Sequence, residues 1–237
     1  TSRRATMNFD LYGFGPALAA GTLMTVQLAL SALLIGLVLG LLGALGKTSP
    51  SKLLQKLGGG YSTLVRGVPE LLWVLLIYFG SVNLMRSIGE SLNYPGLELN
   101  AFAAGTIALG LCFGAYATEV FRGAILAIPR GHREAGLALG LSQPRIFWRI
   151  ILPQMWRIAL PGLGNLFMIL MKDTALVSVI GLEEIMRRSQ IAVTASKEPF
   201  TFYLVAAFIY LGLTVIAMTG MYFLEKRAGR GFSRSAA

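Results

Sequence analysis

Charge is scarce in this 237-residue sequence: Asp, Glu, Lys and Arg together make up 14% of it. Soluble domains carry about a quarter charged residues, so these few charges cannot cover a water-facing surface. The single cysteine, Cys112, excludes an internal disulfide. The single histidine, His132, has no partner at the spacing of metal ligands. The sequence therefore predicts lipid as the main solvent, no metal site and no cofactor.

Motifs for nucleotide binding and catalysis are also missing. The glycines at 58–60 are followed by Tyr61 rather than by the lysine of a phosphate-binding loop, and we interpret them as a flexible turn. The sequence contains no Ser/His/Asp arrangement and no metal-ligand cluster. We therefore expect that the chain is not an enzyme and that ATP, where it is used, is bound by another polypeptide.

What the sequence has instead is long apolar runs, and hydrophobic residues make up 55% of it. About 20 consecutive apolar residues cross a bilayer as a helix, in which the backbone polar groups satisfy one another. We predict an all-α membrane protein with five transmembrane helices, at about 17–45, 63–85, 99–121, 158–182 and 199–224. One transmembrane domain would cover 11–225, between an N-terminal tail at 1–10 and a basic tail at 226–237. Residues 1–6 precede the first methionine and are expected to be an artificial extension.

The basic residues are distributed unevenly among the connections, and this distribution predicts the orientation. The first and third connections and the C-terminal tail carry an excess of Lys and Arg, whereas the second and fourth do not. Basic connections stay on the cytoplasmic side, so we expect a periplasmic N-terminus and a cytoplasmic C-terminus. The formal net charge of +10 then follows from membrane topology, and no nucleic-acid partner is expected.

The long third connection, at 129–153, has the pattern of two short helices. The first would end at Gly140, because glycine tolerates left-handed dihedrals. Ser142 and Pro144 suit the N-cap and the first turn of the second helix, which Pro153 would kink or end.

This connection resembles the EAA loop of ABC-importer permeases. The match rests on residues at fixed spacings, which are Glu134, Ala135, Gly136, Gly140, Ile150, Leu152 and Pro153. Gly136 stands where alanine is common in that family. The resemblance implies a coupling helix that docks on a separate ATPase subunit, with Glu134 offering a charge and the small Ala135 and Gly136 permitting close approach. The alternative is an amphipathic hairpin on the lipid headgroups, which explains neither Gly140 nor the Ile-x-Leu-Pro ending.

Other segments extend the resemblance to polar-amino-acid permeases over nearly the whole chain. These segments are Arg66 to Leu71, Gly114 to Tyr116, Glu119 to Ala124 and Lys172 to Ser178. They are most similar to the Q-type permeases of histidine and lysine-arginine-ornithine importers. The resemblance implies the MetI-like fold of type I importers and a multi-pass location in the bacterial inner membrane. It also implies a homodimer of ABC ATPase subunits, a related M-type permease as heterodimer partner and a periplasmic amino-acid-binding protein, besides membrane lipid.

Ionisable residues inside a membrane span are costly, so each is a candidate for the substrate pathway. Asp173 could hold a cationic group of the substrate, or it pairs locally with Lys172 or a neighbouring helix. Glu70 and Glu119 are weaker candidates, because Glu70 could pair with Arg66, one turn earlier, and Glu119 with Arg122. Two further candidates, Thr174 and Ser178, could offer hydroxyls to the substrate or serve helix packing.

The function predicted from these observations is the transmembrane permease subunit of an ABC importer for polar amino acids. Basic amino acids (histidine, arginine, lysine and ornithine) are the expected substrates, and glutamine or glutamate is the alternative. An ion-coupled secondary transporter is a rival, although such folds usually contain internal repeats and more spans. A membrane scaffold without a transport role would have no need of Lys172 and Asp173 at mid-membrane.

Overall fold

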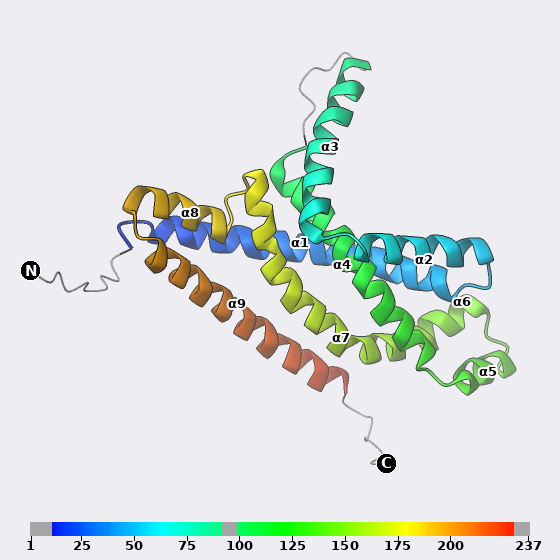
Figure 1. Ribbon diagram of the computed structural model, residues 1–237. Coiled ribbons are helices and arrows are strands. Elements are labelled where there is room, and N and C mark those ends of the chain that lie inside the picture. Colours follow the sequence, from blue (N-terminus) through cyan, green and yellow to red (C-terminus); the bar gives the residue numbers. More distant parts are fainter. Residues whose placement is uncertain (1–10, 92–98, 230–237) are drawn as a thin grey trace, which may run out of the picture. The chain divides into compact units, whose positions relative to one another are not determined.

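A computed structural model describes residues 11–91 and 99–229, and every regular element in these ranges is helical (Figure 1). In chain order the elements are α1 (Gly15–Thr48), α2 (Lys52–Arg66), α3 (Glu70–Ser91), α4 (Ala101–Leu126), α5 (Arg130–Ala138), α6 (Gln143–Ile146), η1 (Phe147–Ile151), α7 (Leu152–Asp173), η2 (Thr174–Ile180), α8 (Ile185–Ser196) and α9 (Pro199–Ala228). Of these, η1 is a π-helix and η2 a 3₁₀-helix. The expected N-terminal tail at 1–10 lies outside the described residues, as does 230–237 of the C-terminal tail.

Within the described ranges, five helical segments are long and apolar enough to cross a membrane, which confirms the predicted number. They are Gly15–Thr48, Glu70–Ile88, Ala101–Leu126, Gln143–Ile180 and Pro199–Ala228. The second begins at Glu70 rather than near 63, because the chain leaves helical structure between Arg66 and Glu70. The fourth begins well before the expected 158, because helical structure continues through Pro153. Of the two outcomes expected at Pro153, a kink or an end of the helix, the end is therefore wrong.

The continuation through Pro153 has a local explanation. The π-helix η1 immediately precedes Leu152 and Pro153, and its wider turns shift the backbone hydrogen-bonding pattern by one residue. Proline has no N–H to donate, so a shifted pattern at this point accommodates it without ending the helix. A second proline, Pro161, lies inside α7.

The described chain divides into two compact units, and each is considered by itself. The first unit contains 11–33, 69–91, 99–109 and 170–215, and the second contains 34–68, 110–169 and 216–229. In the first unit, α8 packs across the N-terminal parts of α1 and α9. Its core there is formed by Leu18, Ala192 and Phe202, and the Phe14 ring meets the Phe202 ring edge-on at a centroid distance of 5.7 Å.

In the second unit, α1 and α4 are packed closely through small residues. A Cβ built on Gly36 would lie 2.5 Å from Cδ1 of Phe113, and one built on Gly40 would lie 2.6 Å from Cβ of Ala117. One built on Gly43 would lie 2.3 Å from Oγ1 of Thr118. Small residues at such spacings let transmembrane helices approach until their backbones are nearly in contact.

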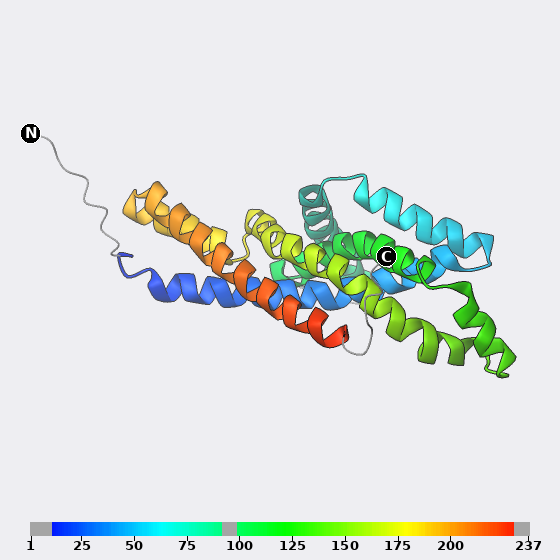
Figure 2. The ribbon, with the colours of Figure 1, turned by 90° about the horizontal axis from the view of Figure 1, so that it is seen from below.

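Helix α2 lies alongside the C-terminal end of α1 (Figures 1 and 2). The flexible turn expected at 58–60 is wrong, because these glycines lie inside α2. A Cβ on Gly58 would lie 2.8 Å from the carbonyl oxygen of Gly43, so glycine is needed here for the close approach of two helices. The side chain of Tyr61, one turn further, donates from its hydroxyl to the carbonyl oxygen of Leu111 at 2.8 Å.

Candidate functional site

The connection at 129–153 forms a compact helical hairpin made of α5, α6 and η1, which pack against one another. Gly140 has a φ of +71°, which confirms the expected left-handed turn after the first helix. The turn is closed by two backbone hydrogen bonds, from Gly140 N to Leu137 O at 2.9 Å and from Leu141 N to Gly136 O at 3.0 Å. Ser142 takes the predicted N-cap position of α6, but its side chain makes no capping hydrogen bond.

Gly136 has a different role from the one expected. It is buried within the hairpin, where a built Cβ would lie 2.9 Å from Cγ1 of Ile146 and 3.1 Å from Cδ1 of Ile150. Its small size therefore serves contact between the two arms of the hairpin. The same geometry gives Ile150 a role in holding the hairpin closed.

Polar contacts tie the hairpin to the start of α7. His132 Nδ1 lies 2.8 Å from Oε1 of Gln154, and Gln154 Nε2 in turn donates to the carbonyl oxygen of Ile150 at 2.7 Å. Within the hairpin, Arg133 of α5 donates from Nη2 to Oε1 of Gln143 of α6 at 2.9 Å. Leu152 and Pro153 lie in the first turn of α7, so the hairpin continues into the fourth membrane-spanning segment without an interruption. A displacement of α5 would thus be passed to α7.

The outer face of α5 is exposed and mixed in character. Glu134 and Ala135 are exposed, and two large apolar side chains beside them are exposed as well, Leu137 by 47% and Leu139 by 79%. Exposed apolar residues flanked by charge are typical of a surface that another protein covers. The expected docking face therefore contains Leu137 and Leu139, which the sequence pattern did not single out.

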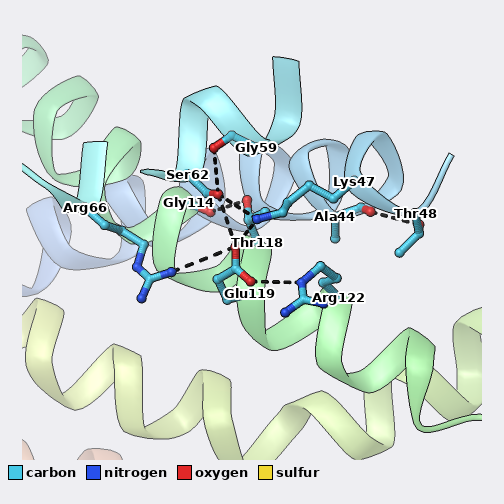
Figure 3. Close-up of polar contacts among 10 residues, drawn as sticks. All are labelled: Ala44, Lys47, Thr48, Gly59, Ser62, Arg66, Gly114, Thr118, Glu119 and Arg122. Atoms are coloured by element: carbon cyan, nitrogen blue, oxygen red, sulfur yellow. Dashed lines mark hydrogen bonds and ion pairs between the residues drawn. The ribbon is translucent and has the colours of Figure 1, made fainter. Parts of the chain in front are cut away.

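A second polar cluster in the same unit is centred on Glu119 of α4 (Figure 3). Its Oε1 accepts from Lys47 Nζ and, at 3.1 Å, from Ser62 Oγ, while its Oε2 accepts from Arg122 Nε at 2.9 Å. Arg66 Nη1 lies 3.9 Å from Oε1. The predicted Glu119–Arg122 pair is confirmed, but it is one of several contacts by which this carboxylate joins α1, α2 and α4.

Arg66, which the sequence offers as a possible partner of Glu70, makes contacts with α4. Besides its approach to Glu119, its guanidinium lies over the ring of Tyr116 at 5.3 Å from the centroid. A carboxylate that is so fully engaged with fixed cations is poorly available to a substrate. The structure therefore favours the structural alternative for Glu119 over a place in the substrate pathway.

The remaining candidates lie in the first unit, where η2 packs against α3. Asp173 is the half-buried residue that precedes η2, and its carboxylate is within electrostatic range of Glu70 and Lys172. Glu70 is the first residue of α3. Two carboxylates from separate helices thus lie near each other, with one lysine beside them.

Thr174 and Ser178, by contrast, are buried, and the hydroxyl of each donates to a backbone carbonyl three residues earlier. Thr174 Oγ1 donates to the carbonyl oxygen of Met171 at 2.7 Å, and Ser178 Oγ donates to that of Ala175 at 2.6 Å. Their hydroxyls satisfy backbone carbonyls of their own helix, which favours the packing alternative for both.

Comparisons with known proteins show which family the chain belongs to. Residues 13–230 match the model of the family described as binding-protein-dependent transport system inner membrane component. The chain belongs to this family. It is 41% identical over 225 residues to the histidine/lysine/arginine/ornithine transport system permease protein HisQ of Escherichia coli, covering 95% of this chain and 99% of HisQ.

Two solved structures are similar to this permease. A crystal structure of an amino acid ABC transporter with histidines matches it with a TM-score of 0.78 at 31% identity, covering 96% of this chain and 99% of the other. A chain of the inward-facing MetNI methionine ABC transporter matches with a TM-score of 0.75 at 17% identity, covering 91% and 98%, and shows the fold alone. The permease therefore has the predicted MetI-like fold, and it is a multi-pass transport component of the inner membrane and not a catalytic enzyme.

One notable residue of the permease was missed by sequence reasoning. Glu184 is fully buried and lies in the connection that follows the fourth membrane-spanning segment. Its carboxylate accepts hydrogen bonds from the backbone N–H groups of Met186 and Arg187 and from the Tyr210 hydroxyl, each at 2.9 Å. Burial raises the pKa of Glu184, and these three hydrogen bonds oppose the shift. The signal in the sequence was an acidic residue just before a helix, where it can cap the first turn.

Proposed function

We propose that the permease is one of two related membrane subunits of an ABC importer for basic amino acids. A homodimer of ATPase subunits would act on α5 from the cytoplasm, and a periplasmic binding protein would deliver the substrate from the other side. This orientation, with a periplasmic N-terminus and a cytoplasmic C-terminus, is the one that the distribution of Lys and Arg favours. The second membrane subunit would be a related M-type permease.

The observation that carries the transport mechanism is the continuity between the exposed α5 face and a membrane-spanning helix. Gly140 and Gly136 close the hairpin tightly, and the His132–Gln154 contact joins it to α7. Closure of an ATPase dimer would move α5, and the hairpin would transmit the movement as one body. No nucleotide-binding motif is needed in this chain for that role.

The observation that favours basic substrates is the proximity of Glu70 and Asp173 in the first unit. Two like charges near each other in a membrane-spanning protein attract cations, and Lys172 beside Asp173 is one such cation. A guanidinium, imidazolium or ammonium group of a substrate would be attracted to the same pair of carboxylates. The 41% identical HisQ belongs to a histidine/lysine/arginine/ornithine system, which supports the same substrate class.

The experiment is uptake of labelled arginine into proteoliposomes that contain the permease with its partner subunits and binding protein. Histidine, lysine and ornithine should compete with arginine, and glutamate and glutamine should not. Asp173→Asn and Glu70→Gln should each lower arginine uptake about tenfold, the effect of removing one charged hydrogen bond. The exposed Glu198 provides a matched control, and Glu198→Gln should transport normally.

Two results would contradict the proposal. Stronger competition by glutamine or glutamate than by lysine would favour the alternative substrate class. Uptake that continues without ATP but needs an ion gradient would favour a secondary transporter.

A further inference from the structure

The second unit contains a large apolar cavity to which the proposed transport mechanism assigns no occupant. Its volume is about 1100 Å³, and it is partly open. Leu37 and Leu41 of α1 form one wall, Trp156 and Pro161 of α7 form another, and Ala228 at the end of α9 completes it. The lining is predominantly apolar, so the cavity is suited to a hydrocarbon chain.

The extent of the cavity can be followed along α7. The α7 residues that line it run from Leu152 to Pro161, which corresponds to about 13 Å along a helix. Beyond Pro161, α7 and α9 come so close that a Cβ on Gly164 would lie 2.6 Å from Cγ of Met221. The cavity, called the groove below, is therefore lined by the N-terminal part of α7, and no residue of the close α7–α9 contact is among its lining residues.

One aromatic side chain marks the wall of the groove. Trp156 is 41% exposed, and its ring stacks on that of the buried Phe121 at a centroid distance of 6.2 Å. Tryptophan is enriched at the level of lipid headgroups, because its ring is apolar and its N–H is polar. The fluorescence of Trp156 should therefore respond to a molecule that occupies the groove.

Positively charged residues lie in the lining of the groove and next to it in the sequence of α9. Arg157 is among the lining residues, and Lys226 and Arg227 immediately precede Ala228 and are exposed. Among the described residues that line the groove, none is acidic. Even with Glu225 in the same turn of α9, cations are in excess here.

We propose that the groove binds one anionic phospholipid, with an acyl chain along α7 and the phosphate group near Lys226, Arg227 and Arg157. The occupant is argued from charge complementarity, because the apolar wall suits an acyl chain and the cations suit its phosphate group. Membrane lipid is present wherever this multi-pass protein is located. A zwitterionic lipid would fill the apolar part but would gain less from the cations.

The position of the groove gives the lipid a consequence for transport. Leu152, Pro153 and Gln154 line it, and Gln154 also contacts His132 of the coupling hairpin. A bound lipid would therefore stabilise the junction between the hairpin and α7. This consequence rests on the proposed function, whereas lipid binding itself does not.

The test is quenching of Trp156 fluorescence by brominated lipids in the full-length permease. Replacing the other two tryptophans, Trp73→Phe and Trp148→Phe, leaves Trp156 as the single tryptophan. The protein is placed in phosphatidylcholine vesicles that contain a minor fraction of either brominated phosphatidylglycerol or brominated phosphatidylcholine. We expect an apparent association about threefold to tenfold higher for phosphatidylglycerol, as a few cations near a phosphate should give.

The variants separate a specific site from general attraction to anionic lipid. The double substitution Lys226→Gln with Arg227→Gln should abolish most of the preference, and Arg157→Gln should lower it in the same direction. The matched control removes two exposed lysines of α2, Lys52→Gln with Lys56→Gln, and should leave the preference unchanged.

Three outcomes would overturn the proposal. Equal quenching by the two brominated lipids means ordinary contact with bulk lipid. Weak quenching by both means that protein covers the groove, for instance a second copy of the permease. A preference that survives the Lys226/Arg227 substitution but disappears in the α2 control places the anionic lipid elsewhere. None of these measurements depends on uptake. Failure of the lipid-binding proposal would therefore leave the proposed transport function untouched.

Discussion

Replacing Glu119 by glutamine should be the most destabilising loss of a single charge in the second unit. The substitution keeps the shape of the side chain but removes the counter-charge of Lys47 and Arg122, with Arg66 at 3.9 Å. A hydrogen bond to a charged group contributes about 1.5–3 kcal/mol, and Glu119 makes such contacts to two cations and a hydroxyl.

The sum of those contacts overstates the effect, because the cations can turn toward water. The side chains of Lys47 and Arg122 are already 20% and 38% exposed. We therefore expect a loss of about 2–4 kcal/mol, less than for a fully buried pair. In a chain of this size that corresponds to a fall in Tm of several degrees.

The assay is thermal unfolding of the purified permease in detergent, followed by helical circular dichroism. Glu198→Gln is the control, since Glu198 is exposed and its loss should change stability by less than about 0.5 kcal/mol. A double-mutant cycle with Lys47→Gln should show a coupling energy above about 1 kcal/mol. If Glu119→Gln unfolds at the same temperature as Glu198→Gln, the cluster does not join the three helices as described.

Two further predictions concern packing and pH. Gly40→Ala should lower the free energy of unfolding by about 1–3 kcal/mol, because its Cβ would lie 2.6 Å from that of Ala117. The control is Gly59→Ala, which has open space around it and should be neutral or stabilising. Tm shifts of the same sign and size for both variants would contradict the close packing of α1 on α4. Burial raises the pKa of Glu184 in the folded protein above its ordinary value of 4.5. The protonated form of Glu184 therefore stabilises the folded protein. This contribution is complete below pH 4.5 and is lost as the pH rises through the folded-state pKa. Glu184→Gln should flatten that fall in Tm with pH, and an unchanged slope would mean that another group titrates.

Features that depend on neighbours in the sequence were predicted well. Gly140 was expected to take a left-handed conformation because a helix ended there, and Arg122 lies one turn from Glu119 on the same helix. The five membrane-spanning segments follow from apolar runs, which need no knowledge of tertiary contacts. In each case the physical cause is contained within a short stretch of chain.

Features that depend on distant contacts were not predicted. Lys47 and Ser62 reach Glu119 from 72 and 57 residues away, and no local pattern relates them. Gly58 was assigned to a turn because glycines favour turns, whereas its role depends on the backbone of Gly43 in another helix. The inward position of Gly136 likewise depends on Ile146 across the hairpin.

The central claim is that α5 docks on a separate ATPase subunit and passes its movement to α7. Site-directed cross-linking tests this most directly, because the single native cysteine, Cys112, is buried and introduced cysteines would react selectively. Ala135→Cys on the exposed face of α5 should link to the ATPase subunit, and the link should block ATP-driven uptake, while Thr194→Cys on the exposed face of α8 should not link. A cross-link from Thr194→Cys, with none from Ala135→Cys, would contradict the account.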